Sequence, residues 1–430
     1  ATVQREQVSD EQLSTLFWIN ALLGVVLALA SLAMAPLLVA FYREPRLLWV
    51  TAFMGVGFFL NALGVQHTAL LQRHLRFTTI AVIEAASLIA STVTGIVMAL
   101  AGLGYWSLVA MALVVPAVNS AGAWLAAGWI PGRPRRGVGV LSMIRFGGAV
   151  TLNALVMYFA YNLDKVLLGR FRGAEVLGVY GRAYQLVNIP TENLNAAVGG
   201  VAFSALSRLQ DDKERFRNYF LKGYALVLGV TWPVTIACAL FARDIVLVAL
   251  GAKWLEVAQL LRLLAPTIMV FALINPLSWL MFSYNLVGRS LKIAFVIAPV
   301  VTIGYALGLP FGAAGIAFAF SASMLLLAVP VSLWAVHGTV VSWRDLLEVS
   351  GRPFVAALVG AVFCLLITPL LARVPWAVMR LVLGTGVLVV LYGWTLLYAL
   401  GQKAFYLDLV KRVLGRSMAE GEPAEIASVS

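Results

Sequence analysis

Residues 14–35 read STLFWINALLGVVLALASLAMA, a run without a single charged side chain. A stretch of roughly 20 apolar residues is long enough to cross the hydrocarbon core of a bilayer as a helix. Eleven further stretches of comparable length and composition follow: 47–71, 78–101, 105–129, 142–164, 175–205, 217–241, 256–284, 290–309, 313–336, 351–372 and 376–400. The sequence therefore predicts an all-α, polytopic membrane protein with about twelve transmembrane helices.

The composition leaves little room for a soluble domain. Hydrophobic residues make up 62% of the chain and charged residues 12%, against about 25% charged in soluble domains. The longest polar connections, 130–141, 206–216 and 337–350, are shorter than the ~50 residues that a domain needs. No phosphate-binding loop, H-E-x-x-H motif or Cys/His cluster occurs, and Cys238 and Cys364 lie in separate apolar stretches. We therefore expect no enzyme, no cofactor and no metal.

The net charge of +12 is best explained by membrane topology. Lys and Arg concentrate in the cytoplasmic loops of membrane proteins. When the loops are assigned alternately to two sides, the side of the N-terminus collects more than twice as many Lys and Arg as the other. This distribution predicts that both termini are cytoplasmic, and a nucleic-acid partner is not expected.

An internal repeat relates two parts of the chain. Residues 9–46 and 211–253 share an acidic start, an aromatic entry, a glycine near the middle of the helix and a second short apolar run. Two helix sets with the same orientation are parallel repeats, which occur in transporters. Residues 142–337 hold six predicted helices, whereas residues 1–130 hold four. The sequence therefore predicts two further helices ahead of residue 1 in a full-length protein of fourteen spans.

These features predict two parallel-repeat lobes and a tail. The expected parts are an N-terminal lobe, a basic cytoplasmic linker, a C-terminal six-helix lobe, two additional transmembrane helices and a cytoplasmic amphipathic and acidic tail. Their ranges are 1–130, 131–141, 142–337, 351–400 and 401–430.

A polar stripe runs along the predicted helix 175–205. Its members recur at spacings of three or four residues and thus share one helix face: Arg182, Gln185, Asn188, Glu192 and Asn195. Single polar residues in membrane helices are usually packing hydrogen bonds, but five on one face, two of them ionisable, favour a water-filled path. Pro190 interrupts the backbone hydrogen bonding and predicts a kink.

Other polar residues give weaker signals. Glu84 stands out among serines and threonines on helix 78–101, and Asn162, Asp164 and Lys165 lie near the end of helix 142–164. Charges at such an end are often only partly paired and reach toward the interface. His67 is a lone histidine among apolar residues, for which a packing role is the usual explanation.

The chain resembles a known family over nearly all of residues 1–400. The most specific motifs are NLDKVLLGRF at 162–171 and LGVYGRAYQL at 177–186. Further matching stretches lie at 1–20, 70–84 and 203–217. The sequence is similar to the polysaccharide flippases of the multidrug/oligosaccharidyl-lipid/polysaccharide (MOP) exporter superfamily, of the Wzx/WzxC type. One departure is Ser204, where such proteins usually have proline.

The resemblance implies fourteen helices in two six-helix lobes plus two. It also implies transfer of undecaprenyl-diphosphate-linked sugar units from the cytoplasmic to the periplasmic leaflet of a bacterial inner membrane. The mechanism would be alternating access around a cavity between the lobes. The expected partners are the lipid-linked oligosaccharide, membrane lipids, and a polysaccharide polymerase or export machinery.

Under this reading, the polar residues fall into three roles. Arginines would pair with the diphosphate: Arg182, Arg145 and Arg262. Hydrogen-bonding side chains would contact sugars: Asn188, Asn195, Asn162, Gln185 and Tyr184. Glu192 and Asp164 are the candidates for coupling to a proton or cation.

Three alternatives stay open from the sequence. A cation-coupled drug antiporter of the same superfamily would share the fold, and only substrate tests separate it. A polysaccharide polymerase or ligase generally carries a large periplasmic loop, which is missing here. A membrane subunit without transport activity would not need the polar stripe.

Overall fold

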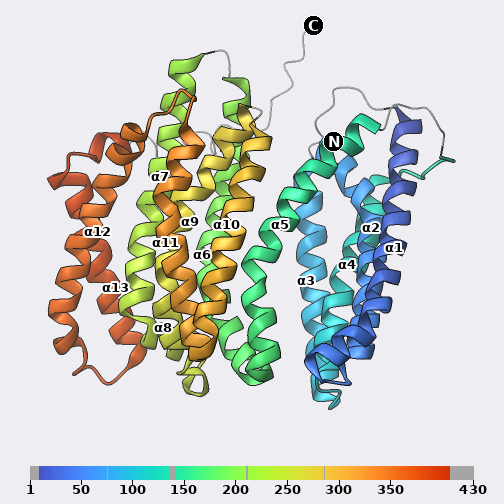
Figure 1. Cartoon of the computed structure of the whole chain (residues 1–430), viewed down its shortest axis with the longest axis horizontal. Coiled ribbons are helices and arrows are strands. Elements are labelled where there is room, and N and C mark those ends of the chain that lie inside the picture. Colours follow the sequence, from blue (N-terminus) through green and yellow to red (C-terminus); the bar gives the residue numbers. More distant parts are fainter. Residues whose placement is uncertain (1–8, 75, 135–140, 210–211, 285, 407–430) are drawn as a thin grey trace, which may run out of the picture. The chain divides into compact units, whose positions relative to one another are not determined.

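The structure is a computed structural model that describes residues 9–74, 76–134, 141–209, 212–284 and 286–406. Side chains are described for most of these residues; the exceptions are 141–150, 153–154, 193–198, 200–205, 207–208 and 287. Within these ranges every regular element is helical (Figure 1).

Each of the twelve predicted segments forms one long helix in the described part of the chain. In order, they are α1 (Asp10–Tyr42), α2 (Leu47–Arg73), α3 (Phe77–Leu100), α4 (Trp106–Ala127), α5 (Leu141–Phe171), α6 (Gly173–Arg208), α7 (Lys213–Leu240), α9 (Val257–Ser283), α10 (Val287–Gly308), α11 (Gly312–Val336), α12 (Trp343–Leu371) and α13 (Ala377–Trp394). Short elements are α8 (Ala242–Ala249), the 3₁₀ turns Ala252–Trp254 and Leu309–Phe311, and the π-turn Thr395–Ala399.

Length and hydropathy mark nine described segments as able to cross a membrane, and one of them, Gly288–Val336, contains both α10 and α11. The protein is therefore a multi-pass membrane protein. α5 and α6 are not among the nine. α6 carries the polar stripe, which lowers its mean hydropathy.

The chain divides into two compact units, residues 1–152 and 153–430. The division falls inside α5, within the predicted C-terminal lobe. In the first unit α1 packs on α2, α2 on α4, and α4 on α3. In the second unit α7 packs on α9, α9 on α11, and α11 on α10, which is the same order. This common order supports the parallel repeat inferred from the sequence.

The two repeats differ where the short second apolar run was expected. In the first repeat this run simply continues α1 to Tyr42, and Arg43 ends the helix in the left-handed conformation at φ 57°. In the second repeat α7 ends at Leu240 and α8 forms a separate helix. The structural similarity between the repeats therefore does not extend to this helix end, although both sequences have the second apolar run.

Glycine permits the closest helix contacts in the first unit. A Cβ built on Gly64 of α2 would lie 2.9 Å from the Ser120 Cα of α4. The Ser120 hydroxyl donates to the Leu60 carbonyl at 2.5 Å across the same contact. Small residues of this kind let membrane helices approach closely, because dispersion and hydrogen bonds, not the hydrophobic effect, hold them together.

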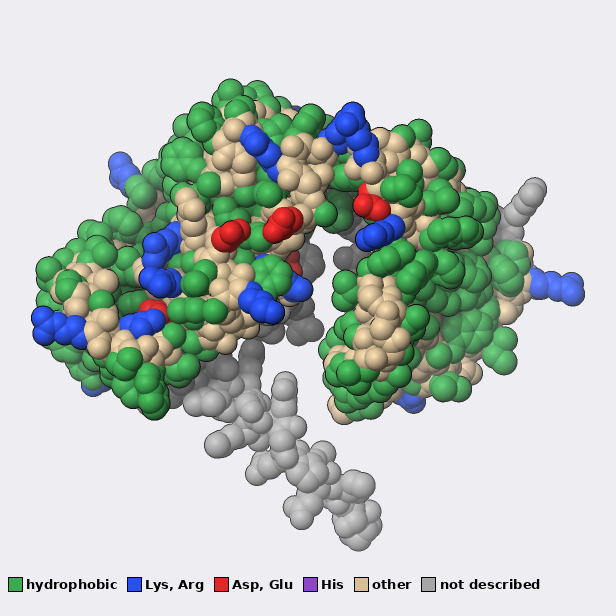
Figure 2. Space-filling view, turned by 90° about the horizontal axis from the view of Figure 1, so that it is seen from below, with side chains coloured by type: hydrophobic (Ala, Val, Ile, Leu, Met, Phe, Trp, Pro, Cys, Tyr) green, Lys and Arg blue, Asp and Glu red, His purple; other side chains and the backbone are tan. Residues whose placement is uncertain are grey.

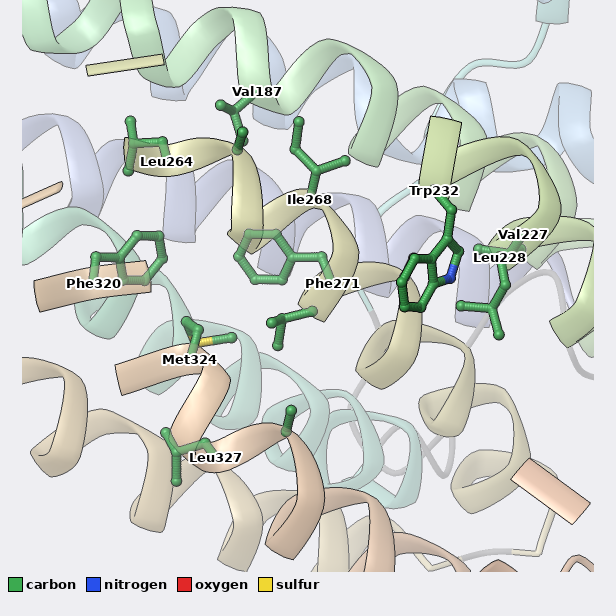
Figure 3. Packing of buried hydrophobic residues seen from close by; sticks show 14 of the residues in the cluster. Val187, Val227, Leu228, Trp232, Leu264, Ile268, Phe271, Phe320, Met324 and Leu327 are labelled. Atoms are coloured by element: carbon green, nitrogen blue, oxygen red, sulfur yellow. The ribbon is translucent and has the colours of Figure 1, made fainter. Parts of the chain in front are cut away.

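The main core lies in the second unit around α9, where 61% of the residues in the most apolar stretch of the helix are buried. Ile268 and Phe271 of α9 lie against Val187 of α6 and Phe320 of α11 (Figure 3). The Phe271 and Phe320 rings are 6.3 Å apart. By contrast, only 11–17% of the residues in the corresponding apolar stretches of α1 to α4 are buried. Hydrophobic side chains cover most of the flanks in Figure 2, as expected of helices that face lipid.

The α12–α13 hairpin is attached to α7 and α8 by two ion pairs. Arg217 of α7 binds Asp345 of α12 through both carboxylate oxygens, with 3.0 Å from Nε to Oδ2. Arg380 of α13 binds Asp244 of α8 at 2.6 Å. Ser342 and Asp345 also form a capping box, so α12 begins at Trp343 and not at the predicted residue 351.

Candidate functional site

Two hydrogen bonds join neighbouring members of the predicted polar stripe along α6. Arg182 Nη1 donates to Gln185 Oε1 at 2.9 Å, and Asn188 Nδ2 donates to Glu192 Oε1 at 3.0 Å. Arg182, Gln185 and Glu192 are exposed on the second unit. α6 continues as one helix across Pro190. An exposed charged face on a membrane helix requires water or a polar partner beside it.

A lysine that the sequence analysis did not assign to the site joins this face. Lys165 of α5 directs its ammonium to the Asn162 Oδ1 at 2.6 Å and over the Tyr184 ring of α6, 4.0 Å from its centroid. The residue was known to lie near a helix end, but its partners depend on how α5 packs on α6. The signal available in the sequence was the position of Lys165 within the motif NLDKVLLGRF, directly after Asp164.

These side chains line one pocket of about 420 Å³ on the second unit. Its walls combine a cation, a carboxylate, two amides and an aromatic ring: Lys165, Glu192, Gln185, Asn188 and Tyr184, with Gly181 and Ile189 between them. Four of the predicted residues therefore share one pocket. Amides and a phenol suit sugar hydroxyls, and the ammonium suits a phosphate oxygen.

Asp164, predicted as a coupling residue, is fully buried and not part of the pocket wall. It accepts from the Tyr180 hydroxyl at 2.6 Å and from the Lys165 backbone N–H at 2.7 Å. The Tyr180 ring stacks 6.3 Å from the Tyr184 ring, and the Lys165 ammonium lies over the Tyr184 ring. Asp164 thus lies behind the pocket and is linked to it by two aromatic rings and by its neighbour Lys165.

The arginines that were predicted to bind the diphosphate lie in different surroundings. Arg182 lies over the Trp254 ring at 5.6 Å and touches the pocket only through Gln185. Arg262 is exposed on α9 and does not line the pocket in the described part of the chain. The side chains of Arg145 and Asn195 lie outside the described residues.

Packing accounts for the serines and for His67 among the weaker sequence signals, whereas the Glu84 side chain is exposed on α3. The Ser87 hydroxyl bonds the Glu84 carbonyl within α3 at 2.8 Å, and Ser91 donates to the Met111 carbonyl of α4 at 3.0 Å. His67 is buried, lies 3.1 Å from the Trp129 carbonyl and stacks on Trp124 at 4.1 Å. Among the described residues, no group of His, Cys, Asp and Glu has the arrangement of a metal site.

Comparisons with known proteins agree with this architecture. A family model described as polysaccharide biosynthesis protein matches residues 1–259, which is more than half of the chain. The lipopolysaccharide biosynthesis protein WzxC of Escherichia coli (strain K12) is 29% identical over 74% of this chain and 65% of its own length. The teichuronic acid biosynthesis protein TuaB of Bacillus subtilis (strain 168) is also 29% identical, over 64% of this chain and 58% of its own.

The match to the succinoglycan biosynthesis transport protein ExoT of Rhizobium meliloti (strain 1021) is longer. It is 25% identical and covers 97% of this chain and 84% of ExoT. The chain spans less than two thirds of the length of WzxC and TuaB.

Solved structures show the fold. The inward closed conformation of the lipid II flippase MurJ superposes with a TM-score of 0.70 at 14% identity, over 94% of this chain and 86% of MurJ. An inward-facing multidrug resistance MATE family transporter of the MOP superfamily gives a TM-score of 0.60, over 76% and 80%. The chain belongs to the polysaccharide biosynthesis protein family, with the fold of MOP-superfamily transporters.

Proposed function

We propose that this protein flips an undecaprenyl-diphosphate-linked oligosaccharide across the bacterial inner membrane for polysaccharide biosynthesis. The observation that carries the proposal is the exposed polar face of α6, completed by Lys165 of α5 in one pocket. The similarity to WzxC, TuaB and ExoT, which are proteins of lipopolysaccharide, teichuronic acid and succinoglycan biosynthesis, supports a polysaccharide precursor as the cargo.

The chemistry of the pocket matches the two polar parts of such a cargo. Gln185 and Asn188 each offer a donor and an acceptor, as sugar hydroxyls require. Lys165 offers an ammonium to the diphosphate, whose charge would otherwise be costly to bring between membrane helices. The prenyl chain needs no polar site, because it stays in the lipid beside the apolar outer faces of the helices.

The proposed orientation follows from the positive-inside rule. Both termini lie in the cytoplasm, and the cargo moves from the cytoplasmic to the periplasmic leaflet. The lobes rock around the polar face in alternating access. The expected partners are membrane lipids, the lipid-linked oligosaccharide, and a polymerase or export machinery that receives it.

Coupling to a cation or proton is assigned to Glu192 and Asp164. Glu192 shares the pocket with Lys165, so cargo phosphate and the Glu192 carboxylate compete for the same ammonium. Asp164 has Tyr180 as a hydroxyl partner, which leaves its charge state sensitive to the position of α6.

Complementation tests the proposal. The full-length gene is expressed in a bacterium that lacks its exopolysaccharide flippase, and lipid-linked glycan and surface polysaccharide are measured together. Restored surface glycan with loss of the intermediate supports flipping. Glu192→Gln should reduce export at least tenfold, whereas the same change at Glu175, exposed in the first turn of α6, should leave export intact.

A persistent intermediate despite normal expression would contradict the proposal for that glycan. Cation-dependent resistance to drugs in the same strain would then favour the antiporter. Export that is normal in both Glu192→Gln and Lys165→Gln would contradict the site assignment while leaving the cargo class intact.

A further inference from the structure

A second pocket lies on the second unit, away from the polar face of α6. It has a volume of about 310 Å³ and is bounded by α7, α12 and the segment that follows α13. α7 and α12 begin at the same end of this unit, since Arg217 and Asp345 in their first turns form an ion pair. The pocket therefore lies near one end of membrane-spanning helices, at the depth of lipid headgroups.

The walls of the pocket are amphipathic. Among the described residues that line it, Lys222 of α7 and Arg352 of α12 supply two cations, and Glu348 supplies one carboxylate. Asn218 and Gln402 add amide groups. Arg352 and Glu348 are exposed, and Lys222 is half-buried. Two cations and two amides around a space of this size match a phosphate with a small polar substituent.

The apolar wall continues this chemistry toward the bilayer. Leu221, Ala225 and Pro353 form part of the lining beside Phe405. The Tyr406 hydroxyl donates to the Ala225 carbonyl at 3.3 Å, and the Tyr406 ring lines one side of the pocket. Aromatic rings of this kind concentrate at the level of lipid headgroups. The pocket therefore offers polar groups for a headgroup and apolar groups for the start of acyl chains.

We propose that this pocket binds the headgroup of an anionic phospholipid, such as phosphatidylglycerol. Arg352 and Lys222 hold the phosphate, Asn218 and Gln402 hold the headgroup hydroxyls, and Glu348 limits affinity by repelling the phosphate. The bound headgroup fills the pocket between α7, α12 and the segment that follows α13. This site is separate from the cargo pocket and does not depend on which cargo the protein carries.

The proposal predicts opposite effects for two neighbouring residues. The full chain is purified from mixed phosphatidylcholine and phosphatidylglycerol vesicles, and retained lipids are counted by native mass spectrometry after graded delipidation. Arg352→Gln should lower phosphatidylglycerol retention at least fivefold, because it removes a phosphate ligand. Glu348→Gln should raise retention about two- to fivefold, because it removes the repelling carboxylate.

The matched control is Arg344→Gln, which removes an exposed arginine from the first turn of α12 outside the pocket. Its phosphatidylglycerol retention should equal that of the unmodified protein. The proposal is overturned if phosphatidylcholine is retained as well as phosphatidylglycerol. It is also overturned if Arg352→Gln and Arg344→Gln behave alike, or if Glu348→Gln lowers retention. Soluble glycerol phosphate should not displace the lipid; displacement would mean that the site binds free phosphate esters.

Discussion

Replacing Lys165 by glutamine is the sharpest perturbation of the proposed cargo site. The ammonium is already held by Asn162 at 2.6 Å and by the Tyr184 ring at 4.0 Å, so binding a phosphate requires little further ordering of the side chain. A hydrogen bond to a charged group contributes about 1.5–3 kcal/mol. At 1.4 kcal/mol per tenfold, the substitution should raise Kd about 10- to 100-fold.

The assay is binding of a synthetic undecaprenyl-diphosphate-linked sugar to the purified protein, with undecaprenol as the uncharged reference. Lys165→Gln should weaken binding of the diphosphate and leave binding of undecaprenol unchanged. Lys253→Gln is the control, because Lys253 is an exposed lysine outside the pocket. Equal affinity of both variants for the diphosphate, with unchanged thermal unfolding, would refute the role of Lys165.

Three further predictions concern stability, each read from thermal unfolding in detergent. Tyr180→Phe should lower the free energy of unfolding by about 1–3 kcal/mol, because it leaves the buried Asp164 carboxylate without one of its donors. Tyr305→Phe should have almost no effect, since the Tyr305 hydroxyl is buried without a partner among the described residues. Equal losses of stability in the two variants would contradict this prediction. Gly64→Ala should lower the free energy of unfolding by about 1–3 kcal/mol, because the added methyl group forces α2 and α4 apart. Gly57→Ala should be neutral, since its added Cβ would lie 3.4 Å from Leu113. A neutral Gly64→Ala would mean that α2 and α4 can separate without a loss of stability. Asp345→Ala should lower the free energy of unfolding by about 2 kcal/mol, because it removes both the side-chain cap of α12 and the ion pair. Arg217→Ala should lower it by about 1 kcal/mol, because it removes only the ion pair and the Arg217 side chain is 40% exposed. Equal losses in the two variants would mean that the cap contributes no stability.

The number and order of the helices could be predicted from the sequence because bilayer thickness sets a minimum apolar length. Helix ends were less accurate. The start of α12 at Trp343 depends on the cap formed by Ser342 and Asp345, which a search for apolar residues does not detect. The difference between α1 and the α7–α8 pair depends on the helix break at Phe241, which hydropathy does not encode.

The sequence could predict only those residues of the candidate site that share a face of one helix, α6. The face shared by Gln185, Asn188 and Glu192 follows from the period of a helix, and their common pocket agrees with it. Lys165 was missed because its contact with Tyr184 depends on how α5 packs on α6. Arg262 lies on α9, and the sequence period of a helix does not by itself show which face of α9 is turned toward α6. The two helices predicted ahead of residue 1 stay a prediction.

The central claim is that the face of α6 lines an aqueous path for cargo. The most direct test is labelling of single cysteines by a membrane-impermeant thiol reagent, with the buried Cys238 and Cys364 replaced by alanine. Gln185→Cys and Asn188→Cys should react, and lipid-linked glycan should protect them. Val187→Cys, on the buried face, and Leu365→Cys, on the apolar surface of α12, should not react. Labelling of Leu365→Cys but not of Asn188→Cys would contradict the account.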